Sequence, residues 1–264
     1  MKPIKILSFA ALFLAVALAS TAFIKQPKIM KTESKGFAVV ELFTSEGCSS
    51  CPPADALVAR IEKEAADKPI YILAYHVDYW DRLGWKDQFS SAAFSNRQSE
   101  YARYLHLNSV YTPQIVVNGK TEFVGSEEGT LRNAIRTNLE RDNAAQLALT
   151  ATAMGNKQAA IKYNIDGADK NTVLQVAILE KNAASKVERG ENKGRTLAHV
   201  QIVRKLQQVD LTGNSGVVSV VLPQGFDQKG WEVIGFLQNR ASGAITGAAK
   251  ATFSNETVVA KSSK

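Results

Sequence analysis

The sequence predicts an α/β domain at residues 37–141, followed by an all-β domain at residues 146–255 that forms an antiparallel sandwich. Three observations favour this fold class. An apolar strand, an amphipathic helix and a second apolar strand follow one another over residues 37–77, in the order of a parallel βαβ unit. A hairpin signal and another helical stripe come next. After about residue 141 helical stripes give way to short β-like runs, and 264 residues suffice for two domains.

The first three elements are defined by their hydrophobic patterns. "FAVVELF" (37–43) is almost continuously apolar, which is typical of a strand buried on both faces. "IYILAYHV" (70–77) is the second strand. The helix between them is expected to begin near Ser50, because Pro52 and Pro53 are tolerated only in a first turn. Its apolar stripe is Ala54, Leu57, Val58, Ile61 and Ala65.

The remaining elements follow in order. Residues 78–110 are mostly helical, "PQIVV" (113–117) and "TEFV" (121–124) flank the hairpin signal Asn118-Gly119, and a last helix carries Leu131 to Leu139. Roughly seven β-like runs then fill the sandwich: "LALTATAM", "QAAIKYNI", "TVLQVAILE", "LAHVQIVRKL", "GVVSVVLP", "WEVIGFLQN" and "GAITGAAKATF".

The N-terminus predicts export. Two lysines precede the uncharged run "ILSFAALFLAVALASTAF", and small residues close it, so residues 1–22 have the pattern of a secretory signal peptide cleaved after Ala19 or Ala22. The alternative is an uncleaved anchor. Residues 23–36 lack periodicity and are expected to form a linker. The mature protein would be periplasmic or secreted, and if the peptide is cleaved no stable membrane insertion is expected.

The net charge excludes few classes of protein, but its distribution does not favour a nucleic-acid-binding protein. Lys and Arg number 32 against 25 Asp and Glu, which gives a formal net charge of +7. Several of these lysines lie near the chain ends, and no basic run is interleaved with aromatic residues. A mildly basic, solvated surface is therefore the interpretation, with no nucleic-acid partner.

The chemistry centres on Cys48 and Cys51, the two cysteines of the chain, in "GCSSC". A disulfide across so small a loop removes little entropy from the unfolded chain and so adds little stability. A zinc site needs more ligands than two cysteines supply. At a helix N-terminus the dipole stabilises a thiolate, so Cys48 is expected to attack and Cys51 to resolve the mixed disulfide. Copper(I) handling by the same thiols and an inert disulfide in an interaction protein are the alternatives. No resident metal or cofactor is predicted.

The arrangement resembles the thioredoxin fold. "TPQIVVNGK" (112–120) is similar to the segment in which a cis proline opens the third strand, which implies that Pro113 is that proline and that the backbone of Thr112 lies beside Cys48. The segments "VVELFTSEGCSSCPPADAL", "HVDYWDRLGWKDQF", "SVYTPQIVVNG" and "RGENKGRTLAHV" resemble a family of exported bacterial thioredoxin-like proteins known as domain of unknown function 1223 (DUF1223). The resemblance implies a fold and a redox site but no substrate. From the thiol chemistry itself, a protein or small thiol is the expected partner.

Further residues are candidates for the site. Glu41 is the one acid in its apolar strand, and thioredoxins carry a proton-transferring Asp near this position; a solvent-facing Glu is the alternative. His76 and Asp78 stand at the end of the second strand, where ligands gather, and Asp78 could assist acid–base chemistry. Trp80 belongs to an aromatic segment that either contacts a partner or packs in the core. In "VERGENKGRTLAHV", residues Arg189, Glu191, Arg195 and His199 form either an anion-binding loop or a solvated hairpin.

Overall fold

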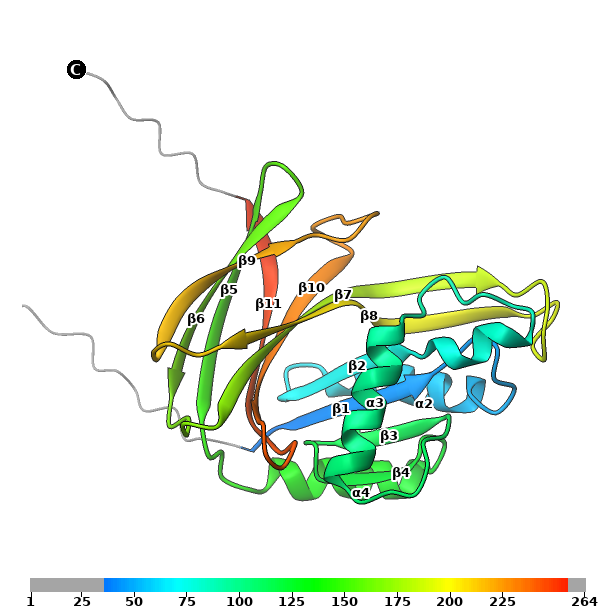
Figure 1. Ribbon diagram of the computed structural model, residues 1–264, viewed down its shortest axis with the longest axis horizontal. Coiled ribbons are helices and arrows are strands. Elements are labelled where there is room, and N and C mark those ends of the chain that lie inside the picture. Colours follow the sequence, from blue (N-terminus) through cyan, green and yellow to red (C-terminus); the bar gives the residue numbers. More distant parts are fainter. Residues whose placement is uncertain (1–35, 256–264) are drawn as a thin grey trace, which may run out of the picture. The chain divides into compact units, whose positions relative to one another are not determined.

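The computed structural model describes residues 36–255, which belong to one compact unit, and Figure 1 shows their arrangement. The predicted signal peptide (1–22) and most of the linker lie outside the described residues. The helical elements are α2 (Pro52–Ala65), the 3-10 helix η1 (Asp78–Leu83), α3 (Ala92–Tyr104) and α4 (Glu128–Leu139). The strands are β1 (Ala38–Thr44), β2 (Ile70–His76), β3 (Gln114–Val117), β4 (Thr121–Val124), β5 (Gln146–Met154), β6 (Gln158–Asp166), β7 (Thr172–Lys186), β8 (Thr196–Asp210), β9 (Ser215–Val221), β10 (Trp231–Asn239) and β11 (Ile245–Asn255).

The first half of the described chain follows the sequence closely. β1 and β2 pair in parallel, β3 is antiparallel to β1, and β4 completes the order β4-β3-β1-β2. Asn118 and Gly119 both have positive φ, 48° and 66°, in the three-residue turn between the paired residues Val117 and Thr121, so the predicted hairpin is confirmed. The helix after β1 begins at Pro52 rather than near Ser50, because the two prolines occupy its first positions and Cys51 is its N-cap.

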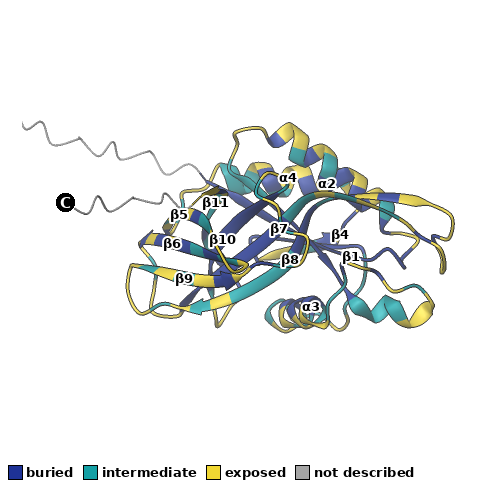
Figure 2. Ribbon diagram, turned by 90° about the horizontal axis from the view of Figure 1, so that it is seen from above, coloured by how far each residue is buried: buried dark blue, intermediate teal, exposed yellow. Residues whose placement is uncertain are grey.

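β1 is buried on both faces because helices cover each side of it (Figure 2). α2 and α4 cover one face, where Leu57 and Leu131 pack against Val40 and Leu42. α3 covers the other, where its aromatic side chains pack with Val39 and Phe43. Each aliphatic side chain buried in this way contributes about 1.5–3 kcal/mol relative to exposure. The near-continuous apolarity of β1 therefore follows from its central place.

The second half contains the seven predicted strands, β5 to β11, and among the described residues no helix follows α4. A separate antiparallel sandwich is not confirmed. All eleven strands follow one another in one mixed sheet, ordered β4-β3-β1-β2-β8-β7-β10-β11-β5-β6-β9. β8 joins β2 in parallel through Ala74 and Ile202, and β11 is parallel to β5. The protein is thus mostly β, with helices gathered on the N-terminal half.

Long strands connect the two halves. β7 and β8 are 15 residues each, longer than the apolar runs that predict them. Leu179 and Phe236 of the second half lie in the same buried cluster as Val39 and α3. The alternate face of β7 and β10 packs against β5, β6 and β9 in a second cluster. The core of the first half is consequently completed by strands from the second.

Candidate functional site

Cys48 and Cys51 form a disulfide at the point where β1 has ended and α2 begins, with their Cα atoms 5.4 Å apart. Both residues have an exposed fraction of 0%, whereas Ser49 and Ser50 between them are exposed. The pair therefore lies just beneath a turn that solvent can reach.

The Thr112–Pro113 bond is cis, as the sequence predicts. The Cys48 Sγ lies 3.8 Å from the carbonyl oxygen of Thr112. Trp80 of η1 donates its indole N–H to the Thr112 hydroxyl at 2.8 Å, and its Cβ lies close to Gly47. The structure thus brings Cys48, Thr112, Pro113 and Trp80 together, as expected for one site.

Glu41 is placed elsewhere, and neither expectation for it holds. It is fully buried, which excludes a solvent-facing role, and it lies with Val39 and Phe43 on the α3 face, opposite α2. There it forms an ion pair with Arg97 at 2.6 Å and accepts a hydrogen bond from the Tyr101 hydroxyl. Burial alone would lower the pKa of Arg97, but Glu41 outweighs it and the pKa is raised. Glu41 is a structural ion-pair partner, not a neighbour of the cysteines.

His76 and Asp78 are engaged by side chains other than the cysteines. The Asp78 carboxylate accepts from the Ser95 hydroxyl of α3. His76 is fully buried, and its Nδ1 lies 2.6 Å from the carboxylate of Asp87. Burial would raise the pKa of Asp87, but His76 and the backbone N–H groups of Glu46 and Phe89 together more than offset this, so the pKa is lowered.

A buried acid–base cluster, which the sequence did not predict, lies next to the disulfide segment. His199 of β8 has its ring nitrogens 3.4 Å from the Glu46 carboxylate and 3.9 Å from that of Asp55, distances that suit ionic attraction better than strong hydrogen bonds. Burial alone would lower the pKa of His199, but Asp55 and Glu46 raise it to about 9. The His76 ring contacts the His199 ring at 4.7 Å. Asp55 lies four residues after Cys51 on α2, a spacing that could have indicated it.

The loop between β7 and β8, residues 187–195, covers the cysteine turn; we call it the cover loop. Buried Asn192 donates from Nδ2 to the carbonyl oxygens of Glu46 and Cys48, at 2.9 Å each. The guanidinium of Arg195 donates to the Oδ1 of Asn192 at 2.8 Å. Gly190 and Gly194 have φ of 75° and 83°, which permits the tight turn. The loop is an exposed hairpin turn at residues 188–191 and 193–195, and buried Asn192 ties it to the cysteine turn.

Glu191 of the cover loop contacts the turn directly. Its exposed carboxylate accepts the Ser49 backbone N–H at 2.9 Å. Hydrogen bonding by Ser49 lowers the pKa of Glu191. A carboxylate held against the cysteine turn makes an anion-binding role for this loop unfavourable. Glu191 and Asn192 reach Ser49 and Cys48 from more than 140 residues away in the sequence, which is why no local pattern predicts their contacts.

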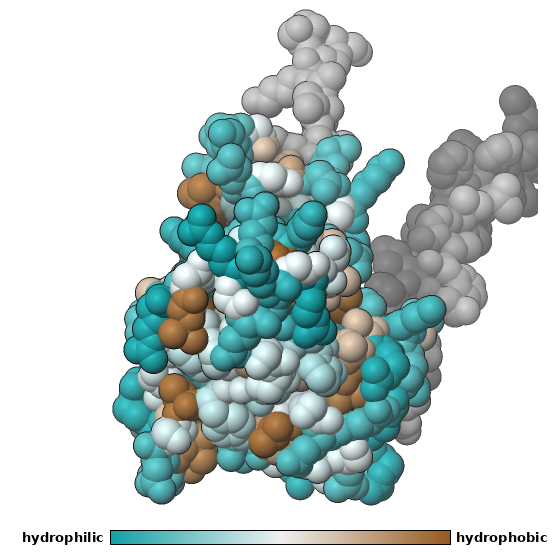
Figure 3. All heavy atoms as spheres, turned by 90° about the vertical axis from the view of Figure 1, so that its right-hand side faces the viewer, coloured by the Kyte–Doolittle hydropathy of each residue, from teal (hydrophilic) through white to brown (hydrophobic). Residues whose placement is uncertain are grey.

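The surface around this end of the molecule is polar. Figure 3 faces the side on which the β7–β8 hairpin and η1 lie, and it shows hydrophilic and neutral surface with scattered hydrophobic spots. A partner that reaches the cysteine turn from this side meets mainly polar groups.

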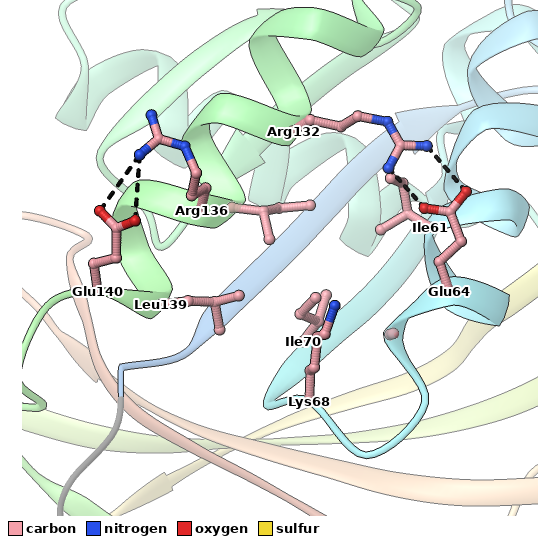
Figure 4. A pocket seen from close by; sticks show the side chains of 10 residues that line it. Ile61, Glu64, Lys68, Ile70, Arg132, Arg136, Leu139 and Glu140 are labelled. Carbon is pink, nitrogen blue, oxygen red and sulfur yellow. Dashed lines mark hydrogen bonds and ion pairs between the residues drawn. The ribbon is translucent and has the colours of Figure 1, made fainter.

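A hollow of about 320 Å³ lies between α2 and α4, apart from the cysteines (Figure 4). Apolar side chains form its floor, and the ion pairs Arg132–Glu64 and Arg136–Glu140 stand on its rim. Neither cysteine lines it. Among residues 36–255 no group of three or more His, Cys, Asp or Glu side chains is arranged to hold a metal ion.

A family model described as "Protein of unknown function (DUF1223)" matches residues 39–238. The chain belongs to this family. The match covers the cysteine turn, Pro113, the cover loop and His199. The DUF1223 region therefore includes the site residues from both halves of the chain.

Solved structures extend the comparison. A crystal structure of a protein from Agrobacterium tumefaciens is 28% identical, with a TM-score of 0.64, and the alignment covers 83% of this chain and 95% of that one. The two proteins therefore share a fold over most of their length. A domain of the outer membrane lipoprotein Omp28 from Porphyromonas gingivalis matches at 9% identity and a TM-score of 0.28, over 44% of this chain and 92% of that domain, which is too low to support an argument. No curated protein matches the chain.

Within residues 36–255 no helix has the length and apolar character needed to cross a membrane.

Proposed function

We propose that this protein carries out thiol–disulfide exchange through Cys48 and Cys51, on a thioredoxin-like α/β part. The observation that carries the proposal is the disulfide at the start of α2 with the Thr112 carbonyl 3.8 Å from the Cys48 Sγ. The strand order β4-β3-β1-β2, with helices on both faces, supports the thioredoxin-like part.

The partner is a protein or small thiol that reaches the turn at Ser49 and Ser50. Thr112 offers an extended partner chain a backbone next to the sulfurs, and pairing of the added chain with that backbone would position its own sulfur for attack. Trp80 holds the Thr112 side chain and so fixes this segment. We further propose that the protein works after export, outside the cytoplasm, because "ILSFAALFLAVALASTAF" has the pattern of a signal peptide and disulfides persist there.

One observation favours a second candidate function. Both sulfur-bearing residues have an exposed fraction of 0%, and the cover loop is hydrogen-bonded over them. A disulfide that stays covered in the native protein would be structural, and the protein would then act as a non-catalytic interaction protein. The two candidates differ in whether the native pair exchanges.

The deciding experiment is thiol labelling of the folded, oxidised protein before and after treatment with mild reductant. Exchange predicts that both thiols become reactive while the protein stays folded. In a second arm, Cys51→Ala should trap a mixed disulfide with its partner through Cys48, and Cys48→Ala is the matched control that should not. A pair that resists reductant until the protein unfolds would favour the structural candidate. Trapping by Cys48→Ala alone would reverse the roles of the two cysteines.

A further inference from the structure

The direction of exchange depends on how well a site stabilises the reduced, thiolate form of its cysteines. Hydrogen-bond donors and positive charge near a thiolate favour the reduced pair and produce an oxidant, whereas their absence favours the disulfide and produces a reductant. The cation beneath the cysteine turn, His199, lies between the carboxylates of Glu46 and Asp55, which offset its charge. The direction of exchange therefore depends on the hydrogen-bond donors around Cys48 and Cys51.

Several of the backbone N–H groups that could stabilise such a thiolate are absent or engaged. Pro52 and Pro53 are the first helical residues and have no N–H. An N-cap side chain accepts from the second or third helical residue; here the second is Pro53, and the third, Ala54, donates to the Cys51 carbonyl at 2.9 Å. The N–H of Cys51 donates to the Cys48 carbonyl at 3.3 Å, and that of Cys48 to Ser45 at 3.2 Å.

The Ser49 N–H is engaged by an anion. It points to the Glu191 carboxylate, which places negative charge against the turn that would carry the Cys48 thiolate. The Thr112 carbonyl oxygen lies 3.8 Å from the Cys48 Sγ, and it is an acceptor that suits a protonated S–H. Ser50 Oγ lies 3.3 Å from the Sγ, but it is also within 3.5 Å of the Thr112 carbonyl, so its single proton has two acceptors.

We infer that the pair acts as a reductant of disulfides in envelope proteins. Glu191 of the cover loop keeps the reduction potential of the pair low by disfavouring the Cys48 thiolate. The inference rests on the proposed exchange function and adds a direction and a specific residue to it. Glu191 is a positioning residue, because it acts through the turn and not on the substrate.

The reaction balances as follows. Cys48 loses its proton to solvent and attacks one sulfur of the substrate disulfide; that S–S bond breaks, and the departing thiolate takes up a proton. Cys51 loses its proton and attacks the Cys48 Sγ, and the mixed disulfide breaks as the second substrate thiolate leaves and is protonated. Two electrons pass from the pair to the substrate, which leaves Cys48–Cys51 oxidised. A partner dithiol must return two electrons to the pair for another cycle.

The test is the equilibrium constant for reduction of the full chain in dithiothreitol buffers, with the oxidised and reduced forms separated after acid quenching. Glu191→Gln removes the charge but keeps an acceptor for Ser49, so reduction should become about threefold more favourable, a shift of about 14 mV. Glu191→Ala also frees the Ser49 N–H, so we expect the equilibrium constant for reduction to rise about tenfold, a shift of about 30 mV in the reduction potential. Glu188→Gln, which changes an exposed carboxylate of the same loop, is the matched control and should leave the constant unchanged.

A second variant tests the argument without the cover loop. Pro53→Ala restores a backbone N–H at the second helical position and should likewise make reduction severalfold more favourable. The wild-type disulfide should remain oxidised in glutathione buffers that reduce the disulfides of strongly oxidising proteins. Reduction of the wild type by such buffers, or equal constants for Glu191→Gln and Glu188→Gln, would overturn the inference alone. A native pair that equilibrates with no dithiol in any variant would instead overturn the proposed function, and the inference with it.

Discussion

At the scale of residues, buried charges in this protein divide into two kinds. The Glu41–Arg97 pair is enclosed on the α3 face and completes its hydrogen bonds with Tyr101 and Gln238. His199 instead lies between two carboxylates whose oxygens are 3.4 and 3.9 Å from its ring nitrogens, beneath the cysteine turn. The first kind contributes to stability with no link to the sulfurs, and the second makes stability depend on pH.

We expect Glu41→Gln to lower the free energy of unfolding by about 3–5 kcal/mol, because it leaves the buried Arg97 charge uncompensated. Replacing both partners, Glu41→Gln with Arg97→Met, should restore part of the loss. Denaturant unfolding measures both effects. The rate of thiol exchange in the folded variant should not change, and a slowed rate with little loss of stability would return Glu41 to a proton-transfer role.

The second prediction at this scale concerns His199. Its pKa is raised from 6.5 to about 9, so its stabilisation is complete below pH 6.5 and is lost as the pH rises through 9. The oxidised wild type should lose on the order of 3 kcal/mol of unfolding free energy over this window. Glu46 and Asp55 face the ring directly, and His76, itself paired with Asp87, packs against it.

Unfolding of wild type and His199→Gln at a series of pH values provides the measurement. The variant should be less stable at pH 6.5 and should show a much smaller decline toward pH 9. Parallel pH profiles for the two proteins would contradict a charged His199 in the native state.

At the scale of elements, the cover loop joins the all-β half of the chain to the cysteine turn. Its Asn192 amide is fixed by Arg195 on one side and donates to the Glu46 and Cys48 carbonyls on the other. The β7–β8 hairpin is long enough to place this loop over the start of α2 (Figure 1). We therefore expect the hairpin to limit access to the sulfurs as well as to add strands to the sheet.

We expect Asn192→Ala to lower the unfolding free energy by about 1–3 kcal/mol, because two buried carbonyl groups lose their donor. The same change should speed reduction of the native disulfide, since the cover loop is held less firmly. Lys193→Ala, at an exposed position of the same loop, is the control. The rate of reduction by dithiothreitol and a denaturant titration give the two readouts, and an unchanged rate would show that the loop does not limit access.

At the scale of the whole molecule, the sheet order makes the two halves depend on each other. β8 is hydrogen-bonded to β2, and side chains of β7, β8 and β10 complete the cluster under α3, among them Ala177, Leu179, Val203 and Phe236. The domain boundary near residue 141 remains a prediction, and this shared core bears on it directly.

A fragment of residues 36–141 should therefore lack a cooperative unfolding transition, because the α3 face of its sheet would be exposed to water. Near-ultraviolet circular dichroism and urea titration of the fragment, compared with residues 36–255, would test this. A sharp transition with native-like aromatic signals in the fragment would show that the first half folds on its own.

The sequence by itself determined what local pattern can specify. The apolar run of β1, the stripe of α2, the Asn118-Gly119 hairpin and seven short β-like runs are periodic or turn signals, and each became the expected element. The cysteine pair and the Thr112-Pro113 segment carried the family resemblance and came together as expected. The polar sequence of α3, in contrast, did not indicate that Arg97 would be buried, because an arginine on such a helix is normally exposed to solvent.

Only the tertiary structure decided which face Glu41 takes and what lies over the cysteines. A strand's alternation shows that neighbouring residues face opposite ways, but not which face receives α2, so Glu41 could be placed only once α3 and Arg97 were in position. Likewise, Asn192, Glu191 and His199 meet the cysteine turn through a hairpin whose placement depends on the pairing of β8 with β2. Contacts between segments so distant in the chain depend on the packing of the whole sheet, and no local pattern encodes them.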